Sequence, residues 1–447
     1  MKKPTPRRLA VEILSRIETD GAYAEPLLDA ALSGAELANP ADRGLLTELV
    51  YGTLRTRGRL DWIIQELYRG NAAELETVVL NIIRTGLYQL QSADRIPPFA
   101  AVNEAVGIAR DLVPAAAGLV NAILRNSLRK GQAIAWPDMA RDPEKAIAVL
   151  HSHPPWLVRR LLASYGVEET VAICRTNNTI APLALRVNSL KATRERVIAA
   201  LAEEGITAEE TLFSPDGITL ASPAAALRKN ACFRQGLIRI QDEASQLIAH
   251  LVAPKPGERL LDLCAGSGGK TLHLAALMGN RGSITAVDLQ SERLRMLREE
   301  AKRLGVAIAE TRTGDAAAPI DSFRDTFDGV LLDAPCSGLG TLRRNPEIRW
   351  RIAPADINRC MKLQNLLLAR AAEYVRPGGR LVYSVCTVTP EEDEMVVGKF
   401  LKNHIAFKVV SPRTLPPVLV DAGGFFRSAP HLHGTDGFFA AVLIRAA

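Results

Sequence analysis

The sequence predicts a protein of three parts: an all-α bundle over residues 1–135, a linker with a small α/β module over residues 136–235, and an α/β domain over residues 236–447. Three observations support this division. Apolar residues recur at helical spacing through nearly all of the first part, strand-like and helix-like segments alternate in the second, and the third repeats a strand followed by a helix. Repeated strand–helix units are typical of a parallel sheet covered by helices.

Composition and charge exclude several classes of protein. The 447 residues are 47% hydrophobic and 23% charged, as in a folded protein rather than a disordered one. The polar start and the lack of an apolar run of ~18 residues predict a cytoplasmic protein that does not enter a membrane. The net charge of +6 is compatible with an anionic partner. The six cysteines form no C-x-x-C pair, so we expect free thiols and no metal site. We also expect a monomer.

The first part has a helical pattern from Pro6 to about Leu128, interrupted at Pro97-Pro98. Two clusters of basic side chains suit contact with phosphate groups, although a solvated helix face explains each equally well. They are Arg55, Arg57 and Arg59, and Arg125, Arg129 and Lys130.

The second part alternates between strand and helix patterns. We predict a strand over residues 183–188, a helix from Thr193 to Glu204 that Thr193 caps, and a strand over residues 218–220. His151 and His153 precede these segments without acidic or thiol neighbours, so we interpret them as loop residues rather than ligands.

A glycine-rich turn organises the third part. Residues 259–263 form a short apolar strand, the turn holds Gly266, Gly268 and Gly269, and a helical pattern follows. Strand, turn and helix form a cradle in which backbone amides at the helix start face a ligand. Asp288 ends the next strand about 20 positions later, where a carboxylate would bind ribose hydroxyls. We therefore expect an adenosine-bearing cofactor.

The turn matches neither a P-loop nor a G-x-G-x-x-G motif. Cys264 stands where a P-loop requires its first glycine, and the glycine spacing is wrong for a dinucleotide site. The run from Asp262 to Lys270 instead resembles the S-adenosyl-L-methionine site of Rossmann-like class I methyltransferases. The other interpretation is a glycine turn that only connects strand to helix.

The strands of an open α/β sheet bind ligands beyond their carboxyl ends. Five candidate residues end predicted strands or follow them closely, so we expect them to converge: Asp262, Asp288, Asp315, Asp333 and Cys386. The uniformly apolar strand over residues 329–333 is predicted to be central, and residues 437–445 are predicted to form an antiparallel edge strand.

Two thiols follow the fourth and fifth predicted strands. Cys336 lies where adenine amino-methyltransferases carry the aromatic residue of an Asn/Asp-Pro-Pro-aromatic motif, and Cys386 follows the strand at residues 380–384. Cytosine C5 is too weak a nucleophile to take a methyl group until a thiolate adds to C6. Paired thiols beside such a cofactor site therefore indicate methylation of a pyrimidine carbon.

Both thiol motifs resemble those of RNA cytosine-5 methyltransferases: Asp333-Ala-Pro-Cys336-Ser-Gly and Tyr383-Ser-Val-Cys386-Thr-Val-x-Pro390-Glu-Glu. The helical part resembles the NusB family, whose members bind RNA, at residues 51–55, 84–90, 101–106 and 118–125. The whole chain resembles the bacterial Sun/Fmu (RsmB) family, which methylates one cytosine in small-subunit (16S) ribosomal RNA.

This resemblance implies roles for single residues. Cys386 would be the nucleophile that forms a covalent adduct with cytosine C6, Cys336 would assist its release, and Asp333 would hydrogen-bond cytosine N3. The cofactor would be S-adenosyl-L-methionine, in a site lined by Cys264, Ala265, Gly266, Ser267, Gly268, Gly269, Lys270, Asp288, Asp315 and Asp333.

Two motifs depart from the family pattern, which has Ala-Pro at Gly266-Ser267 and Thr at Val385. Two other functions remain open: a non-catalytic RNA-binding factor with a decayed methyltransferase domain, and an adenine amino-methyltransferase, which Cys336 disfavours. Residues 341–351 carry four arginines and Trp350, and we expect them to contact RNA, the alternative being a loop anchored by Trp350.

Overall fold

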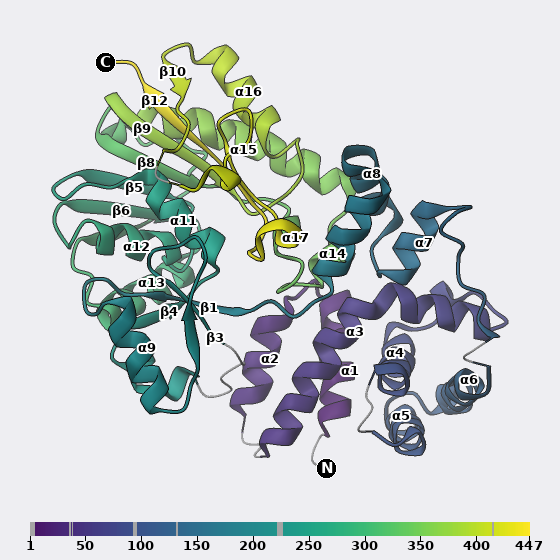
Figure 1. Cartoon of the computed structure of the whole chain (residues 1–447). Coiled ribbons are helices and arrows are strands. Elements are labelled where there is room, and N and C mark those ends of the chain that lie inside the picture. Colours follow the sequence, from purple (N-terminus) through teal and green to yellow (C-terminus); the bar gives the residue numbers. More distant parts are fainter. Residues whose placement is uncertain are drawn as a thin grey trace. The chain divides into compact units, whose positions relative to one another are not determined.

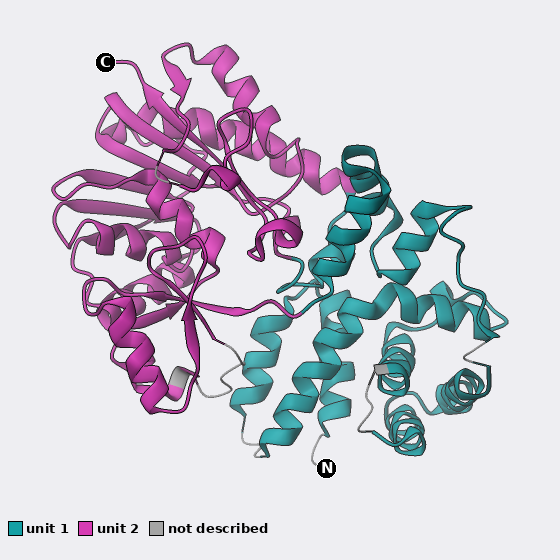
Figure 2. Cartoon of the chain, viewed as in Figure 1, with its two compact units in different colours: residues 1–179, 342–353 teal, residues 180–341, 354–447 magenta. Residues whose placement is uncertain are grey.

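A computed structural model describes residues 5–34, 37, 39–92, 96–130, 133–220, 227–413 and 415–447. The chain forms two compact units, one of residues 1–179 with 342–353 and the other of residues 180–341 with 354–447 (Figure 2). The boundary at residue 179 lies beyond the division at residue 135 that the sequence suggested. In the described ranges, no helix combines the length and apolar character needed to cross a membrane.

The first unit is helical, as predicted. Its helices are α1 (Pro6–Thr19), α2 (Ala24–Ser33), α3 (Pro40–Leu67), α4 (Thr77–Ser92), α5 (Pro98–Leu112), α6 (Ala117–Lys130), α7 (Pro143–Leu150), α8 (Pro155–Asn177) and α14 (Ile348–Arg351) (Figure 1). Thr5 caps α1 by accepting from the Arg8 amide at 3.3 Å, and Pro98 starts α5, where a missing N–H costs nothing.

A buried arginine joins three of these helices. Arg84 on α4 is 3% exposed and makes a two-pronged hydrogen bond to Asp61 on α3, at 2.6 and 3.0 Å. Its Nη1 atom also donates to Glu18 on α1 at 2.7 Å. The two carboxylates compensate the buried charge, so this network fixes the relative positions of α1, α3 and α4.

The segment around α14 completes the helical unit although it follows β8 (Phe327–Asp333), a strand of the second unit, in the chain. Trp350 donates from Nε1 to the Leu54 carbonyl oxygen at 2.9 Å, and Glu347 accepts from the Ala24 amide at 3.0 Å. Arg349 is wholly buried and donates to the Asn178 side chain at 2.7 Å. The expectation that this segment presents its arginines to RNA is therefore wrong for Arg349, which is buried. Trp350 is half-buried and anchors the segment, and its contact with RNA stays a prediction.

Two arginines of the first basic cluster, Arg55 and Arg57, also contact the segment around α14. Arg57 pairs with Glu18 at 3.0 Å and stacks over Trp350, and Arg55 donates to the Arg343 carbonyl oxygen at 3.3 Å. These two side chains serve the packing of the helical unit. The second cluster is different, because Arg125, Arg129 and Lys130 are all exposed.

The second unit begins with the predicted α/β module. An antiparallel sheet in the order β2-β3-β1-β4 is formed by β1 (Leu183–Val187), β2 (Ala208–Glu210), β3 (Gly217–Leu220) and β4 (Ile238–Ile240). The helices are α9 (Arg194–Glu203) and the short α10 (Ala231–Arg234). Thr193 caps α9 as expected, accepting from the Arg196 amide at 3.4 Å.

A larger sheet forms the core of the second unit, in the order β10-β12-β9-β8-β5-β6-β7, with β11 pairing to β12 (Figure 1). The other strands are β5 (Arg259–Leu263), β6 (Ser283–Asp288), β7 (Ala309–Thr313), β9 (Val375–Val385), β10 (Phe407–Val409), β11 (Phe426–Ser428) and β12 (Phe438–Arg445). The helices are α11 (Glu243–Val252), α12 (Gly269–Leu277), α13 (Ser291–Leu304), α15 (Pro354–Tyr374), α16 (Glu394–Asn403) and α17 (Pro430–His433).

Alternate residues of the central strands enter different apolar clusters. On β8, Val330 and Leu332 pack with α15 and α16, whereas Leu331 packs with α11 and α12. Because side chains alternate across a strand, helices cover both faces of the sheet. The uniformly apolar β8 is central, as predicted.

The last strand corrects one expectation. β12 is antiparallel, as predicted, but it is not an edge strand, because it pairs with β9 on one side and with β10 and β11 on the other. Its almost continuous apolar sequence suits this interior position, since both of its faces are covered.

Candidate active site

The carboxyl ends of the parallel strands bring the predicted residues together. β5 lies between β6 and β8 in parallel register, with Leu263 opposite both Val287 and Leu332, and β9 continues beside β8 with Ser384 opposite Asp333. The glycine turn after β5, Asp288 at the end of β6, Asp333 at the end of β8 and Cys386 after β9 therefore lie along one edge of the sheet.

The glycine turn adopts a backbone that favours glycine. Gly266 and Gly268 have φ angles of +57° and +80°, and Cys264 has +63° although it carries a side chain. A Cβ atom at Gly268 would come within 2.4 Å of Leu297, so this position is closed to larger residues. A Cβ atom at Gly266 would meet no atom within 4 Å, so open space lies beside the turn.

Asp288 connects the loops that follow three strands. Its Oδ2 atom accepts from the Gly266 amide and its Oδ1 atom from the Gln290 amide, both at 2.8 Å. Its carbonyl oxygen accepts from the Gly314 amide at 3.1 Å, next to Asp315. Asp315 is exposed and accepts from the Ala317 amide at 2.9 Å.

S-adenosylmethionine fits the residues at this edge. The open space beside Gly266 adjoins backbone amides at the start of α12, and Asp288 keeps a lone pair on each oxygen for ribose hydroxyls. Asp262 is 1% exposed, and its Oδ1 atom is a buried acceptor without a hydrogen-bond partner. Burial raises the pKa of Asp262 to about 7, and a cationic ammonium group of a cofactor would compensate this carboxylate.

Two arginines of the small module hold the glycine turn. Arg186 on β1 donates from Nη1 to the Gly269 carbonyl oxygen at 2.7 Å, and Arg239 on β4 donates to that of Ser267 at 3.1 Å. Arg186 is 1% exposed, and burial lowers its pKa to about 9. Neither arginine was predicted from the sequence, although an arginine between apolar residues of a buried strand signals a charge that needs acceptors.

Asp333 is fixed by two side chains. Lys270 donates from Nζ to Asp333 Oδ2 at 2.6 Å, and Ser384 donates to Oδ1 at 2.7 Å. Burial acts to lower the pKa of Lys270, but the Asp333 carboxylate outweighs it and the net pKa is raised. The pair therefore places a carboxylate and a proton-bearing ammonium next to the turn.

The two predicted thiols meet. The Sγ atoms of Cys336 and Cys386 lie 3.4 Å apart, and both side chains are partly exposed. The hydrogen bond with Cys386, together with burial, raises the pKa of Cys336 well above its usual value. Either sulfur can be the donor in this contact. The remaining cysteines outside the turn, Cys174, Cys232 and Cys360, do not join this pair.

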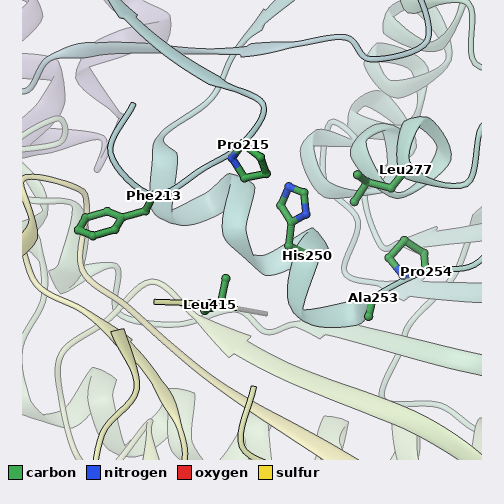
Figure 3. Close-up of a pocket in the computed structure, with 7 residues that line it drawn as sticks. All are labelled: Phe213, Pro215, His250, Ala253, Pro254, Leu277 and Leu415. Carbon is green, nitrogen blue, oxygen red and sulfur yellow. The ribbon is translucent and has the colours of Figure 1, made fainter. Parts of the chain in front are cut away.

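A separate apolar hollow of about 250 Å³ lies elsewhere in the second unit and is lined by Phe213, Pro215, His250, Ala253, Pro254, Leu277 and Leu415 (Figure 3). None of the predicted site residues lines it. On its wall, His250 directs Nε2 at Asp216 Oδ2 at 2.8 Å, and His273 directs Nε2 at the same oxygen at 3.0 Å.

Asp216, His250 and His273 have the residue types of a metal site. However, one aspartate oxygen already accepts from both rings, and Nδ1 of His273 is buried without a partner. A metal-bound histidine normally donates its second N–H to an acceptor. We interpret the cluster as a hydrogen-bonded clasp that joins the loop before β3 to α11 and α12.

Comparisons with known families match the chain in three segments. The family described as 16S rRNA methyltransferase RsmB/F matches residues 249–444, the NusB family matches residues 4–129, and the ferredoxin-like domain of RsmF/B-like methyltransferases matches residues 153–226.

Related proteins extend this similarity over the full length. The chain is 36% identical to the probable ribosomal RNA small subunit methyltransferase B of Bacillus subtilis (strain 168), over 98% of each chain. It is also 36% identical to ribosomal RNA small subunit methyltransferase B of Pseudomonas syringae pv. tomato, over 99% of this chain and 97% of that protein.

Solved structures share the fold. The crystal structure of PH0851 superposes with a TM-score of 0.83 at 29% identity and covers 98% of each chain. NSun6 from Pyrococcus horikoshii, solved with SFG, superposes with a TM-score of 0.59 at 23% identity and covers 67% of this chain and 100% of that one.

Proposed function

This chain belongs to the family of 16S rRNA methyltransferases RsmB/F, and from this premise we propose that it methylates C5 of a cytosine in small-subunit ribosomal RNA through a covalent Cys386–C6 adduct. The family supplies the rRNA substrate and the dependence on S-adenosylmethionine. The target carbon, the covalent route and the role of each residue are the content of the proposal.

One observation carries the choice of carbon and route: the Sγ atoms of Cys336 and Cys386 lie 3.4 Å apart at the carboxyl ends of β8 and β9. Transfer to an exocyclic amine needs no thiol, whereas transfer to cytosine C5 needs a nucleophile at C6 and a group that assists its departure. Two thiols 3.4 Å apart can supply the nucleophile and the assisting group in one place.

Addition and transfer form one sequence of electron movements. The Cys386 thiolate forms a bond to C6, and the C5=C6 electron pair makes C5 a nucleophile. Asp333 would hydrogen-bond cytosine N3, and Lys270, which donates to Asp333 at 2.6 Å, can supply the proton that a carboxylate–N3 hydrogen bond requires. S-adenosylmethionine, when bound, would supply an electrophilic methyl group to the C5 electron pair, and the electrons of the broken methyl–sulfur bond would stay on the cofactor sulfur.

Release reverses the addition. The C5 proton leaves to water, its electron pair restores the C5=C6 double bond, and the C6–Sγ pair returns to Cys386 as a thiolate. Cys336 is 3.4 Å from that sulfur, and its S–H stabilises the departing thiolate by a hydrogen bond. Cys336 therefore controls the second half of the reaction and Cys386 the first.

The cofactor would lie along Cys264, Ala265, Gly266, Ser267, Gly268, Gly269, Lys270, Asp288, Asp315 and Asp333. Support comes from the open space at Gly266 and from the unpartnered Oδ1 atom of Asp262. The departures from the family pattern, at Gly266-Ser267 and Val385, do not remove this support, because Gly266 itself provides the open space. The Ser267 carbonyl oxygen binds Arg239, and Val385 is a buried strand residue.

The direct test incubates the protein with labelled S-adenosylmethionine and ribosomal RNA from cells that lack it, followed by digestion to nucleosides. We expect label in 5-methylcytidine alone. Label in N6-methyladenosine would favour an amino-methyltransferase. Tight RNA binding without label would favour a non-catalytic RNA-binding factor.

A further inference from the structure

Glu392 connects the two loops that carry the thiols. It lies six residues after Cys386 in the turn before α16, and its side chain is wholly buried. Among the described residues it forms no ion pair, so hydrogen-bond donors alone compensate this buried carboxyl group. Burying an acid among neutral partners costs folding free energy. A residue that is kept despite this cost is a candidate for a functional role.

Its carboxyl group accepts from both thiol loops. From the loop of Cys336, the next residue Ser337 donates its amide to Oε1 at 2.8 Å and its hydroxyl to Oε2 at 2.6 Å. From the loop of Cys386, the next residue Thr387 donates to Oε2 at 3.2 Å. A direct contact of 2.8 Å between the Ser337 and Thr387 hydroxyl oxygens completes the bridge.

Glu392 is itself held in place. Thr389 donates to its Oε2 atom at 2.7 Å, and Gln364 on α15 donates to its Oε1 atom at 3.1 Å. The Tyr383 hydroxyl on β9 donates to its backbone carbonyl oxygen at 2.7 Å. The carboxyl group is thus held by α15 and the backbone by β9, as expected of a residue that fixes the positions of its neighbours.

We propose that Glu392 is the positioning residue that sets the spacing of Cys336 and Cys386, and thereby the release of the methylated RNA. The first part concerns the free protein, and the second rests on the proposed function. The thiols come from loops 50 residues apart in sequence, and Ser337 and Thr387 are the covalent neighbours through which Glu392 acts on them. Glu392 does not touch the reacting atoms itself.

The spacing can be measured without RNA or cofactor. Two thiols 3.4 Å apart need only a small movement to reach disulfide geometry, so oxidised glutathione should convert them rapidly to a Cys336–Cys386 disulfide by thiol–disulfide exchange. Each glutathione disulfide takes up two electrons and two protons as the protein thiols are oxidised. The product is identified by peptide mass after digestion.

Glu392→Ala should slow this cross-link by roughly tenfold or more, as is typical of an ångström-scale displacement of reacting groups. Glu392→Gln keeps one oxygen to accept from the Ser337 amide, but its amide NH2 group replaces the oxygen that accepts from three hydroxyls. The cross-linking rate of this variant should therefore lie between those of the wild type and Glu392→Ala. Glu203→Gln, at an exposed glutamate on α9, is the matched control and should react like the wild type. Equal rates in all four proteins would overturn the proposal.

Catalysis supplies the second readout. Both Glu392 variants should still form the covalent RNA adduct and should release it slowly, so that methylated adduct accumulates. If Glu392→Ala does not fold, Glu392→Gln carries both measurements. A slower cross-link with normal adduct release would remove the second part of the proposal. A normal cross-link rate in a variant without activity would remove the first. If the wild type forms no adduct, the proposed function fails while the cross-linking result still stands.

Discussion

Arg186 Nη1 lies 2.7 Å from the carbonyl oxygen of Gly269, so a residue of the small module touches the turn proposed to hold the cofactor. Arg239 makes the equivalent contact to Ser267 at 3.1 Å. The small module therefore supports the turn proposed to hold the cofactor and is not only a spacer between the helical part and the methyltransferase sheet.

Arg186→Met should weaken S-adenosylmethionine binding. The change leaves the Gly269 carbonyl without this buried donor, which costs about 1–3 kcal/mol and loosens the turn. Titration calorimetry below the melting temperature of the variant measures the affinity. Arg196→Met, at an exposed position on α9, is the control. An unchanged affinity in Arg186→Met would show that the turn holds its shape without the module.

Asp288→Ala should weaken cofactor binding and also lower stability. Its carboxylate accepts from the amides of Gly266 and Gln290, so the alanine variant lacks both of these hydrogen bonds as well as the proposed ribose partner. Calorimetric affinity and melting temperature should both fall. If only the melting temperature falls, Asp288 does not contact the cofactor.

The two thiols should give different products when removed. Cys386→Ala cannot add to C6, so neither methylation nor an adduct should form. Cys336→Ala should add and transfer but release slowly, which leaves protein linked to methylated RNA. Denaturing gels after incubation with cofactor and RNA would show a slow band for Cys336→Ala only, and Cys360→Ala should behave like the wild type. A band for Cys386→Ala instead would exchange the two roles.

Acid should destabilise the second unit through His273. Burial lowers its folded pKa to about 3 from the usual histidine value of 6.5. Because the folded pKa is depressed, the unfolded state binds the proton first, and stability falls by about 1.4 kcal/mol per pH unit as the pH drops below 6.5. His273→Gln should remove this slope in hydrogen exchange of α12. All four tryptophans lie in the helical unit, so their fluorescence should show no difference between variant and wild type.

RNA affinity should depend on the exposed cluster at the end of α6. Replacing Arg125, Arg129 and Lys130 by alanine should reduce the slope of log K against log salt by about 0.7–0.9 for each phosphate group that these side chains neutralise. Arg16→Ala, an exposed arginine on α1, serves as the control. If the triple variant kept the full salt slope, this cluster would not contact RNA.

The sequence predicted the parts of the site that follow from local pattern. Strand ends can be read from apolar runs, and parallel strands bring their ends to one edge, so the proximity of Asp288, Asp333 and Cys386 was predictable. The motif resemblance paired Cys386 with Cys336, and the Sγ separation of 3.4 Å agrees with that pairing.

Three features were not predictable because they depend on interactions between distant segments. Glu392 stands in a polar turn, and only the folded loops show that it accepts from Ser337 and Thr387. Trp350 and its arginines have the composition of an RNA-binding loop, but Leu54 and Asn178 provide their partners. The pairing of β12 on both sides depends on β10 and β11, short strands with little pattern of their own.

The placement of residues 342–353 limits how these proteins can be recombined. The chain passes between the two units three times, at residues 179–180, 341–342 and 353–354. A chimera joined at a single point near residue 180 would combine a foreign helical part with this protein's own Glu347, Arg349 and Trp350, whose partners include Ala24, Asn178 and Leu54. Successful exchange of the helical part would require residues 342–353 to be exchanged with it. Substitutions in residues 1–179 and in residues 342–353 should therefore be correlated among related proteins.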